Sequence, residues 1–90
     1  MVFYMGTNAR ASDKATEALA AAIRAQMGRH DVKATELSRA SGIPLSTLRK
    51  ILKYGRVADY GEIRRIAQAL GVSAVSIVRE AEEIESSRAD

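Results

Sequence analysis

Apolar residues recur at steps of three and four along most of the chain, which is the spacing of one face of an α-helix. Five segments with this period follow one another between residues 12 and 86, separated by glycines or short polar stretches. The pattern contains no strand signal and no internal repeat. The sequence therefore predicts an all-α bundle of five helices with short links.

The first two helices are marked by their ends. Ser12 or Asp13 is a suitable N-cap for the first helix, and Gly28 is expected to end it. A second, short helix is expected over residues 31–41. Residues 1–11 show no lasting period, so we expect a flexible arm whose apolar start either folds back or meets a partner.

The segment from Lys33 to Arg56 combines two short helices with a turn. Gly42 permits a tight turn, and Pro44 suits the start of the next helix, where its missing N–H does no harm. The apolar positions that would lock the two helices at a steep angle are Leu37, Ala40, Ile43, Leu48 and Ile51. This arrangement is a helix-turn-helix, whose second helix enters the major groove of DNA.

Two more helices complete the bundle. Asp59 and Glu62 form a capping-box-like start for the fourth helix, and Gly71 is expected to end it. Ser73 is a suitable cap for the fifth helix, which is expected to fray from residue 86 onward. The expected organisation is an arm at residues 1–11, a DNA-binding domain at residues 12–86 and a tail at residues 87–90.

Composition excludes several classes of protein. A chain of 90 residues forms one small domain, and 47% hydrophobic with 28% charged residues is typical of globular proteins. Without Cys and with one His, the chain offers no disulfide, thiolate zinc site or Cys nucleophile, and we expect neither metal nor cofactor. Because no apolar run approaches the roughly 18–20 residues of a membrane span, we expect a cytoplasmic protein without a membrane partner.

Charge is distributed unevenly. Residues 80–90 contain five acidic side chains and one basic one, whereas residues 1–79 contain 13 basic and 6 acidic ones. A basic body with an acidic end suggests a polyanionic partner, with the acidic end facing away from it. An unevenly charged, solvated surface is the alternative.

The outer face of the third helix carries the candidates for reading DNA bases. These are Leu45, Ser46, Thr47, Arg49 and Lys50. Arg or Lys can donate to guanine O6 and N7, and Leu can touch a thymine methyl group. Alternatively, Leu45 packs over the turn and Ser46 caps the helix. The residues expected to contact phosphates flank the groove: Lys33, Thr35, Arg39, Lys53, Tyr54 and Arg56.

Residues 35–73 resemble the Cro/C1-type, lambda-repressor-like helix-turn-helix family. The matching pieces are Glu36-Leu37-Ser38, Gly42-Ile43, Ser46-Thr47-Leu48, Gly55-Arg56 and the segment IAQALGVS at residues 66–73. The resemblance implies a compact five-helix DNA-binding domain that acts as a dimer on an operator and regulates transcription, often in phages.

The chain departs from the family pattern at three places. Tyr54 precedes Gly55, whereas many members have Gly directly after the recognition helix. Met27 and Leu52 occupy the places where many members pair an Arg with a Glu, so we expect an apolar contact instead. Leu45 replaces a frequent Gln, which removes hydrogen-bonding capacity at that position.

The fifth helix is the candidate for assembly. Val78, Ala81 and Ile84 extend beyond what closing a small core requires, which predicts an exposed apolar stripe and a symmetric dimer. A two-fold dimer would place its recognition helices roughly 34 Å apart, one turn of DNA. The alternative is that the stripe covers the open end of the core.

We therefore expect a sequence-specific repressor of a phage or prophage, associated with the nucleoid of a bacterial host. It would occlude a promoter by placing the third helix in the major groove of double-stranded DNA, and a protein antagonist would be one means of control. The alternative is an antitoxin-like protein that binds a partner protein and its own operator. We do not expect an enzyme, because no nucleophile–base motif and no Gly-rich phosphate loop is present.

Overall fold

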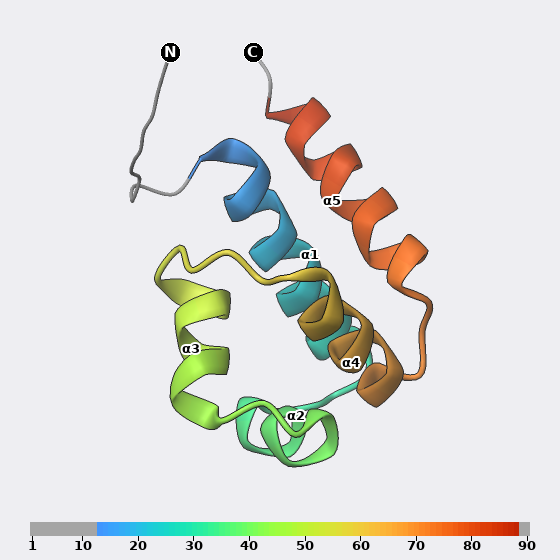
Figure 1. Ribbon diagram of the computed structural model, residues 1–90. Coiled ribbons are helices and arrows are strands. Elements are labelled where there is room, and N and C mark those ends of the chain that lie inside the picture. Colours follow the sequence, from blue (N-terminus) through green and yellow to red (C-terminus); the bar gives the residue numbers. More distant parts are fainter. Residues whose placement is uncertain (1–12, 89–90) are drawn as a thin grey trace.

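The computed structural model describes residues 13–88, which form five helices (Figure 1). The helices are α1 (Lys14–Arg29), α2 (Ala34–Ser41), α3 (Leu45–Lys53), α4 (Tyr60–Leu70) and α5 (Ala74–Ser87). No strand occurs within these residues, so the all-α prediction is confirmed. The expected arm, the capping role of Ser12 and the last two residues lie outside the described range.

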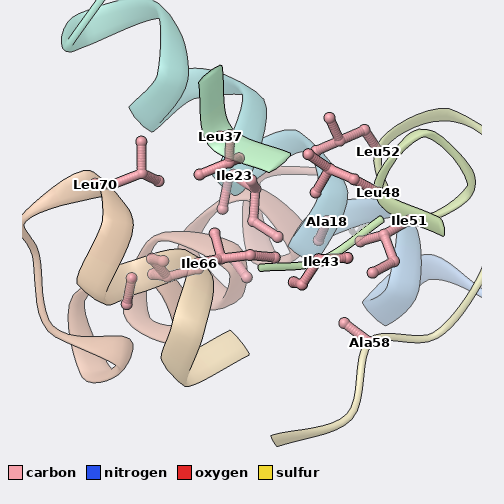
Figure 2. Close-up of a cluster of buried hydrophobic side chains, with 14 residues drawn as sticks. Ala18, Ile23, Leu37, Ile43, Leu48, Ile51, Leu52, Ala58, Ile66 and Leu70 are labelled. Atoms are coloured by element: carbon pink, nitrogen blue, oxygen red, sulfur yellow. The ribbon is translucent and has the colours of Figure 1, made fainter. Parts of the chain in front are cut away.

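The core draws on every helix. It contains Ala18, Ala22, Ile23, Leu37, Ile43, Leu48, Ile51, Leu52, Ala58, Ile66, Ala67, Leu70, Ile77 and Ala81. Figure 2 shows these side chains gathered between the helices and labels ten of them. Fully burying a single Ile or Leu contributes roughly 1.5–3 kcal/mol, so this cluster supplies most of the driving force for folding. The inward orientation expected of Ala40 is wrong: Ala40 is exposed, and Ser41 shares the buried face of α2 with Leu37.

Helix α1 lies between α3 and α5 (Figure 1). Ala18 and Ala22 are fully buried on α1, and their small side chains allow neighbouring helices to approach closely. Glu80 of α5 links the two long helices, because its Oε1 accepts from Gln26 Nε2 at 3.1 Å and pairs with Arg29 Nη2 at 2.5 Å. Packing and polar contacts together hold α5 along α1.

Local capping fixes most helix starts as the sequence predicts. The Asp13 carboxylate accepts from the Thr16 N–H at 2.8 Å at the start of α1. Ser73 Oγ accepts from the Ser76 N–H at 3.1 Å at the start of α5. Gly71, in the left-handed region at φ 75°, ends α4. Helix α5 continues through Ser87, so residues 86 and 87 are helical rather than frayed.

The end of α1 differs from the sequence-based expectation. Gly28 lies inside the helix, which ends one residue later at Arg29. The chain turns at Asp31, whose φ of 55° lies in the left-handed region, and the Val32 N–H donates to the Met27 carbonyl at 2.9 Å. Val32 packs against the core, so a tertiary contact rather than the glycine decides where α1 ends. Helix α2 consequently starts at Ala34 instead of residue 31.

Substituting two glycines tests whether Gly28 lies inside α1 and whether Gly71 ends α4. Gly28→Ala should raise the free energy of unfolding by roughly 0.5–1 kcal/mol, because Ala is favoured over Gly inside a helix. An added Cβ at Gly28 meets no atom within 4 Å. Gly71→Ala should lower the same free energy by about 1 kcal/mol, because a Cβ in the left-handed region is strained. Urea unfolding followed by circular dichroism measures both, and a destabilised Gly28→Ala protein would mean that Gly28 ends the helix after all.

Candidate nucleic-acid interface

Helix α3 has one buried and one exposed face. Leu48, Ile51 and Leu52 are at most 3% exposed and anchor the helix in the core. Ser46, Arg49, Lys50 and Lys53 are exposed on the other side. The core therefore fixes which side chains of α3 are free to meet another molecule.

Two serines and a glycine build the turn before α3. Gly42 takes the left-handed conformation at φ 76°, as its place in the turn predicts. Ser38 Oγ donates to the Ile43 carbonyl at 2.6 Å, and Ser41 Oγ accepts from the Ile43 N–H at 3.2 Å. These bonds satisfy both backbone groups of Ile43 and hold the end of α2 against the start of α3. Sequence reasoning did not assign this role to either serine, although Ser38 belongs to a segment that matches the family and both hydroxyls lie beside the predicted turn.

The candidates for base contact are exposed to different degrees. Ser46, Arg49 and Lys50 are exposed, whereas Leu45 and Thr47 are half-buried. Pro44 occupies the N-cap position and its carbonyl accepts from the Leu48 N–H at 2.9 Å. Ser46 therefore does not cap α3, and its hydroxyl is available on the outer surface.

All six phosphate candidates are exposed around α2 and α3. Lys33, Thr35 and Arg39 lie at the start of α2 or on it, and Lys53 and Tyr54 lie at the end of α3. Tyr54 is 75% exposed, which leaves its hydroxyl accessible.

The sixth phosphate candidate, Arg56, has an intramolecular partner. Its Nη1 pairs with Glu62 Oε1 at 3.0 Å, and the same oxygen accepts from the Asp59 N–H at 3.0 Å. The Asp59 carboxylate accepts in return from the Glu62 N–H at 2.7 Å, which completes the predicted capping box. The Arg56 guanidinium holds the pKa of Glu62 below its usual value through this hydrogen bond. Arg56 thus closes the loop between α3 and α4, a role that its sequence position does not reveal.

Many family members have an ion pair between the first and third helices. In this chain, apolar packing and one polar link take its place. Leu52 is buried in the core and Met27 packs against that core from α1. A polar link is present as well, because Arg24 Nη1 of α1 donates to the Leu52 carbonyl. Sequence reasoning did not single out Arg24, which is 28 residues from its acceptor.

The expected apolar stripe on α5 is divided between the core and the surface. Ala81 is 8% exposed and belongs to the core, and Ile84 is half-buried and packs on it. Val78 is 41% exposed, and the other exposed apolar side chains nearby are Val75 and Tyr60. Ala81 and Ile84 therefore cover the core, as the alternative held, because α5 lies along α1 for most of its length.

Comparison with known proteins agrees with this geometry. Residues 22–77 match the helix-turn-helix family. The chain belongs to the Cro/C1-type helix-turn-helix family. Two crystal structures of the clp gene regulator ClgR from Corynebacterium glutamicum are similar to this helix-turn-helix protein. The first has a TM-score of 0.79 at 25% identity, covering 83% of this chain and 80% of that one. The second has a TM-score of 0.73 at 26% identity, covering 78% and 91%. A search of the curated proteins found no match.

The family assignment makes this helix-turn-helix protein a DNA-binding transcription regulator. Members of the family are typically not enzymes. Within residues 13–88, no group of three or more His, Cys, Asp or Glu side chains is placed to hold a metal ion. The same residues contain no helix that is long and apolar enough to cross a membrane.

The lowered pKa of Glu62 predicts a pH dependence of stability. Because the ionised form is favoured in the folded state, Glu62 stabilises the fold above its unfolded pKa of roughly 4.3, and this contribution is lost as pH falls through the lower folded value. Glu62→Gln should lower the free energy of unfolding at neutral pH by about 1–2 kcal/mol. It should also flatten the loss of stability on acidification.

Thermal unfolding from neutral pH down to about pH 2.5, well below the usual carboxyl range, measures both effects. Glu83→Gln is the control, since Glu83 is exposed on α5. If the two variants follow the same pH profile, the Arg56–Glu62 pair does not stabilise the protein.

Proposed function

We propose that this protein is a sequence-specific repressor that covers a promoter by placing α3 in the DNA major groove. The observation that carries the proposal is the two-sided character of α3. Its inner face is buried, while Ser46, Arg49 and Lys50 are exposed together on the outer face. A helix of this width fits the major groove, where hydroxyls and long cations reach base edges.

The exposed residues divide into two proposed roles. Arg49 and Lys50 would donate to guanine O6 and N7, with Ser46, Thr47 and the Leu45 side chain contacting adjacent base edges. The phosphate contacts would come from Lys33, Thr35, Arg39, Lys53 and Tyr54, which fix the position of the protein without reading sequence. Arg56 would add a phosphate contact only through the guanidinium N–H groups that its bond to Glu62 leaves available.

The regulated genes would belong either to a phage or prophage or to the bacterial host. The family resemblance favours a phage or prophage operator, whereas the similar protein ClgR is a clp gene regulator. We propose the phage or prophage setting, and the sequence of the selected DNA site would distinguish it from a host promoter. Control by a protein antagonist belongs to the same proposal.

We further propose that the active form on DNA is a two-fold dimer joined through α5. A groove of about 330 Å³ lies between the start of α4 and α5, lined by Tyr60, Ala74, Val75, Val78, Arg79 and Glu82. Tyr60 and Val75 are 68% and 62% exposed, and the Arg64 guanidinium lies over the Tyr60 ring, 5.8 Å from its centroid. A cluster of exposed apolar side chains is typical of a surface that meets a partner.

Charge complementarity favours a second copy of this chain as the occupant. Arg79 and Glu82 lie on neighbouring turns of α5 beside the apolar side chains. An antiparallel pairing of two α5 helices, centred between Arg79 and Glu82, brings Arg79 of each copy toward Glu82 of the other, with Val78 beside this centre. Because α5 and α3 lie on opposite sides of α1, such pairing leaves both recognition helices uncovered (Figure 1).

Selection from a random DNA pool tests the DNA-reading proposal. The wild-type protein should enrich a discrete, roughly palindromic site, because a two-fold dimer presents two copies of α3. The double variant Arg49→Ala, Lys50→Ala should bind that site at least about tenfold more weakly, since a good base contact is worth roughly 1–3 kcal/mol.

The double variant Lys14→Ala, Arg29→Ala removes the same charge from exposed positions on α1 and should keep most of the affinity. Equal losses in the two double variants would mean that α3 provides only general electrostatic attraction. Binding without any preferred site would exclude sequence-specific recognition.

Charged substitutions in the groove test the proposed dimer. Val75→Glu or Arg79→Glu should reduce the stoichiometry on a palindromic site from two protein copies to one, because each places repulsive or desolvated charge in the proposed interface. The double variant Arg79→Glu, Glu82→Arg should restore two copies by re-forming the pair in reverse.

Sedimentation of protein–DNA complexes measures this stoichiometry. Val57→Glu is the control, since Val57 is an exposed apolar residue on the loop after α3 rather than in the groove. Two copies bound by every variant would rule out this surface as the dimer interface. Co-purification of a different protein with the wild-type chain, lost in Val75→Glu, would favour the antitoxin-like alternative.

A further inference from the structure

The end of α3 is connected to α1 by a single long side chain. The guanidinium Nη1 of Arg24 donates a hydrogen bond to the backbone carbonyl of Leu52, across 28 residues of sequence. Arg24 itself is exposed, while the Leu52 side chain is buried in the core. One residue of α3 is therefore held from two sides, by apolar packing and by a charged donor.

The Leu52 carbonyl is a favourable acceptor for physical reasons. The last four carbonyls of a helix have no partner within the helix and carry its partial negative charge. Leu52 is the last but one residue of α3, so its carbonyl belongs to this group. A cationic donor at this end supplies the hydrogen bond that the helix lacks and interacts favourably with the helix dipole.

The hydrogen bond from Arg24 adds a third set of contacts that hold α3 in place. Its start is held by Ser38 and Ser41 through the turn, and its inner face by the core. With nine residues, α3 is only about 13 Å long, so its orientation depends on contacts at both ends. Arg24 supplies the contact at the far end, one turn beyond Arg49 and Lys50 along the helix.

We infer that Arg24 is a positioning residue for DNA reading, which sets the orientation of α3 from outside the interface. The inference rests on the proposed role of α3 in base recognition. Hydrogen bonds to base edges require donor–acceptor distances near 2.7–3.2 Å, so a small change in the tilt of α3 weakens them. Contacts between flexible lysines and phosphates tolerate the same change. Loss of Arg24 should therefore reduce specific binding more than general DNA binding.

A matched pair of α1 variants tests the inference. Arg24→Met removes the donor while keeping an unbranched side chain. Arg29→Met removes the same charge from the same helix, but from the ion pair with Glu80 on the α5 side. The ratio of affinities for the selected site and for unrelated DNA should fall about tenfold in Arg24→Met, equivalent to the loss of one base contact. The ratio should stay close to wild type in Arg29→Met, and Arg24→Lys, which keeps a charged donor, should recover part of the loss.

Hydrogen exchange without DNA provides a second readout. The Tyr54 and Arg56 amides both donate to the Lys50 carbonyl at the end of α3, at 3.0 and 3.1 Å. Their exchange should accelerate severalfold in Arg24→Met and remain unchanged in Arg29→Met, because Arg24 contacts this end of the helix whereas Arg29 pairs with Glu80 of α5.

The two readouts separate the possible failures. If the wild-type protein selects a site and Arg24→Met keeps both its affinity ratio and its amide protection, Arg24 does not position α3. If the wild-type protein selects no site, the proposed function fails, and the exchange rates alone decide whether Arg24 holds α3. Should Arg24→Met lose its helical circular dichroism, Arg24→Gln against Arg29→Gln carries the same comparison with a shorter, uncharged side chain, and equal effects of these two variants would overturn the inference.

Discussion

The burial of one face of α3 is the constraint on which the rest of the structure depends. A nine-residue helix is too short to be stable by itself in water, because isolated helices below about 12–15 residues are marginal. Leu48, Ile51 and Leu52 stabilise it by packing into a core that all five helices share. The same packing leaves Arg49 and Lys50 exposed, so the stability of the helix and the DNA-reading role proposed for it have one physical origin.

Apolar packing alone does not fix the positions of the two ends of so short a helix. Polar contacts fix them. Ser38 and Ser41 satisfy the backbone of Ile43 before the helix, and Arg24 satisfies the Leu52 carbonyl at its end. Beyond the helix, Glu62 closes the connecting loop by binding both Arg56 and the Asp59 N–H. These bonds are directional, which means that they fix orientation in a way that non-directional hydrophobic burial does not.

The two sides of α1 serve different purposes. Helices α3 and α5 lie on opposite sides of α1 (Figure 1). Helix α3 presents exposed basic and hydroxyl side chains, whereas α5 combines packing residues with exposed apolar ones. Glu80 shows how the acidic character of α5 is used within the fold, because it binds Gln26 and Arg29 of α1. Separation of the basic face from the acidic helix keeps negative charge away from the surface proposed to meet phosphates, as the uneven charge of the sequence suggests.

The sequence alone determined the features that depend on near neighbours along the chain. Five apolar stripes, the caps at Asp13, Asp59 and Ser73, and left-handed glycines at 42 and 71 follow from interactions spanning at most about four residues, which spacing reveals directly. Only the tertiary structure decided that α1 ends at Arg29 rather than at Gly28, that Ala81 is buried, and that Arg56 binds Glu62. It likewise brought Arg24 to Leu52 across 28 residues. Each of these outcomes depends on which helices pack against one another. The pattern of residue types along one segment does not reveal which other segment packs against it.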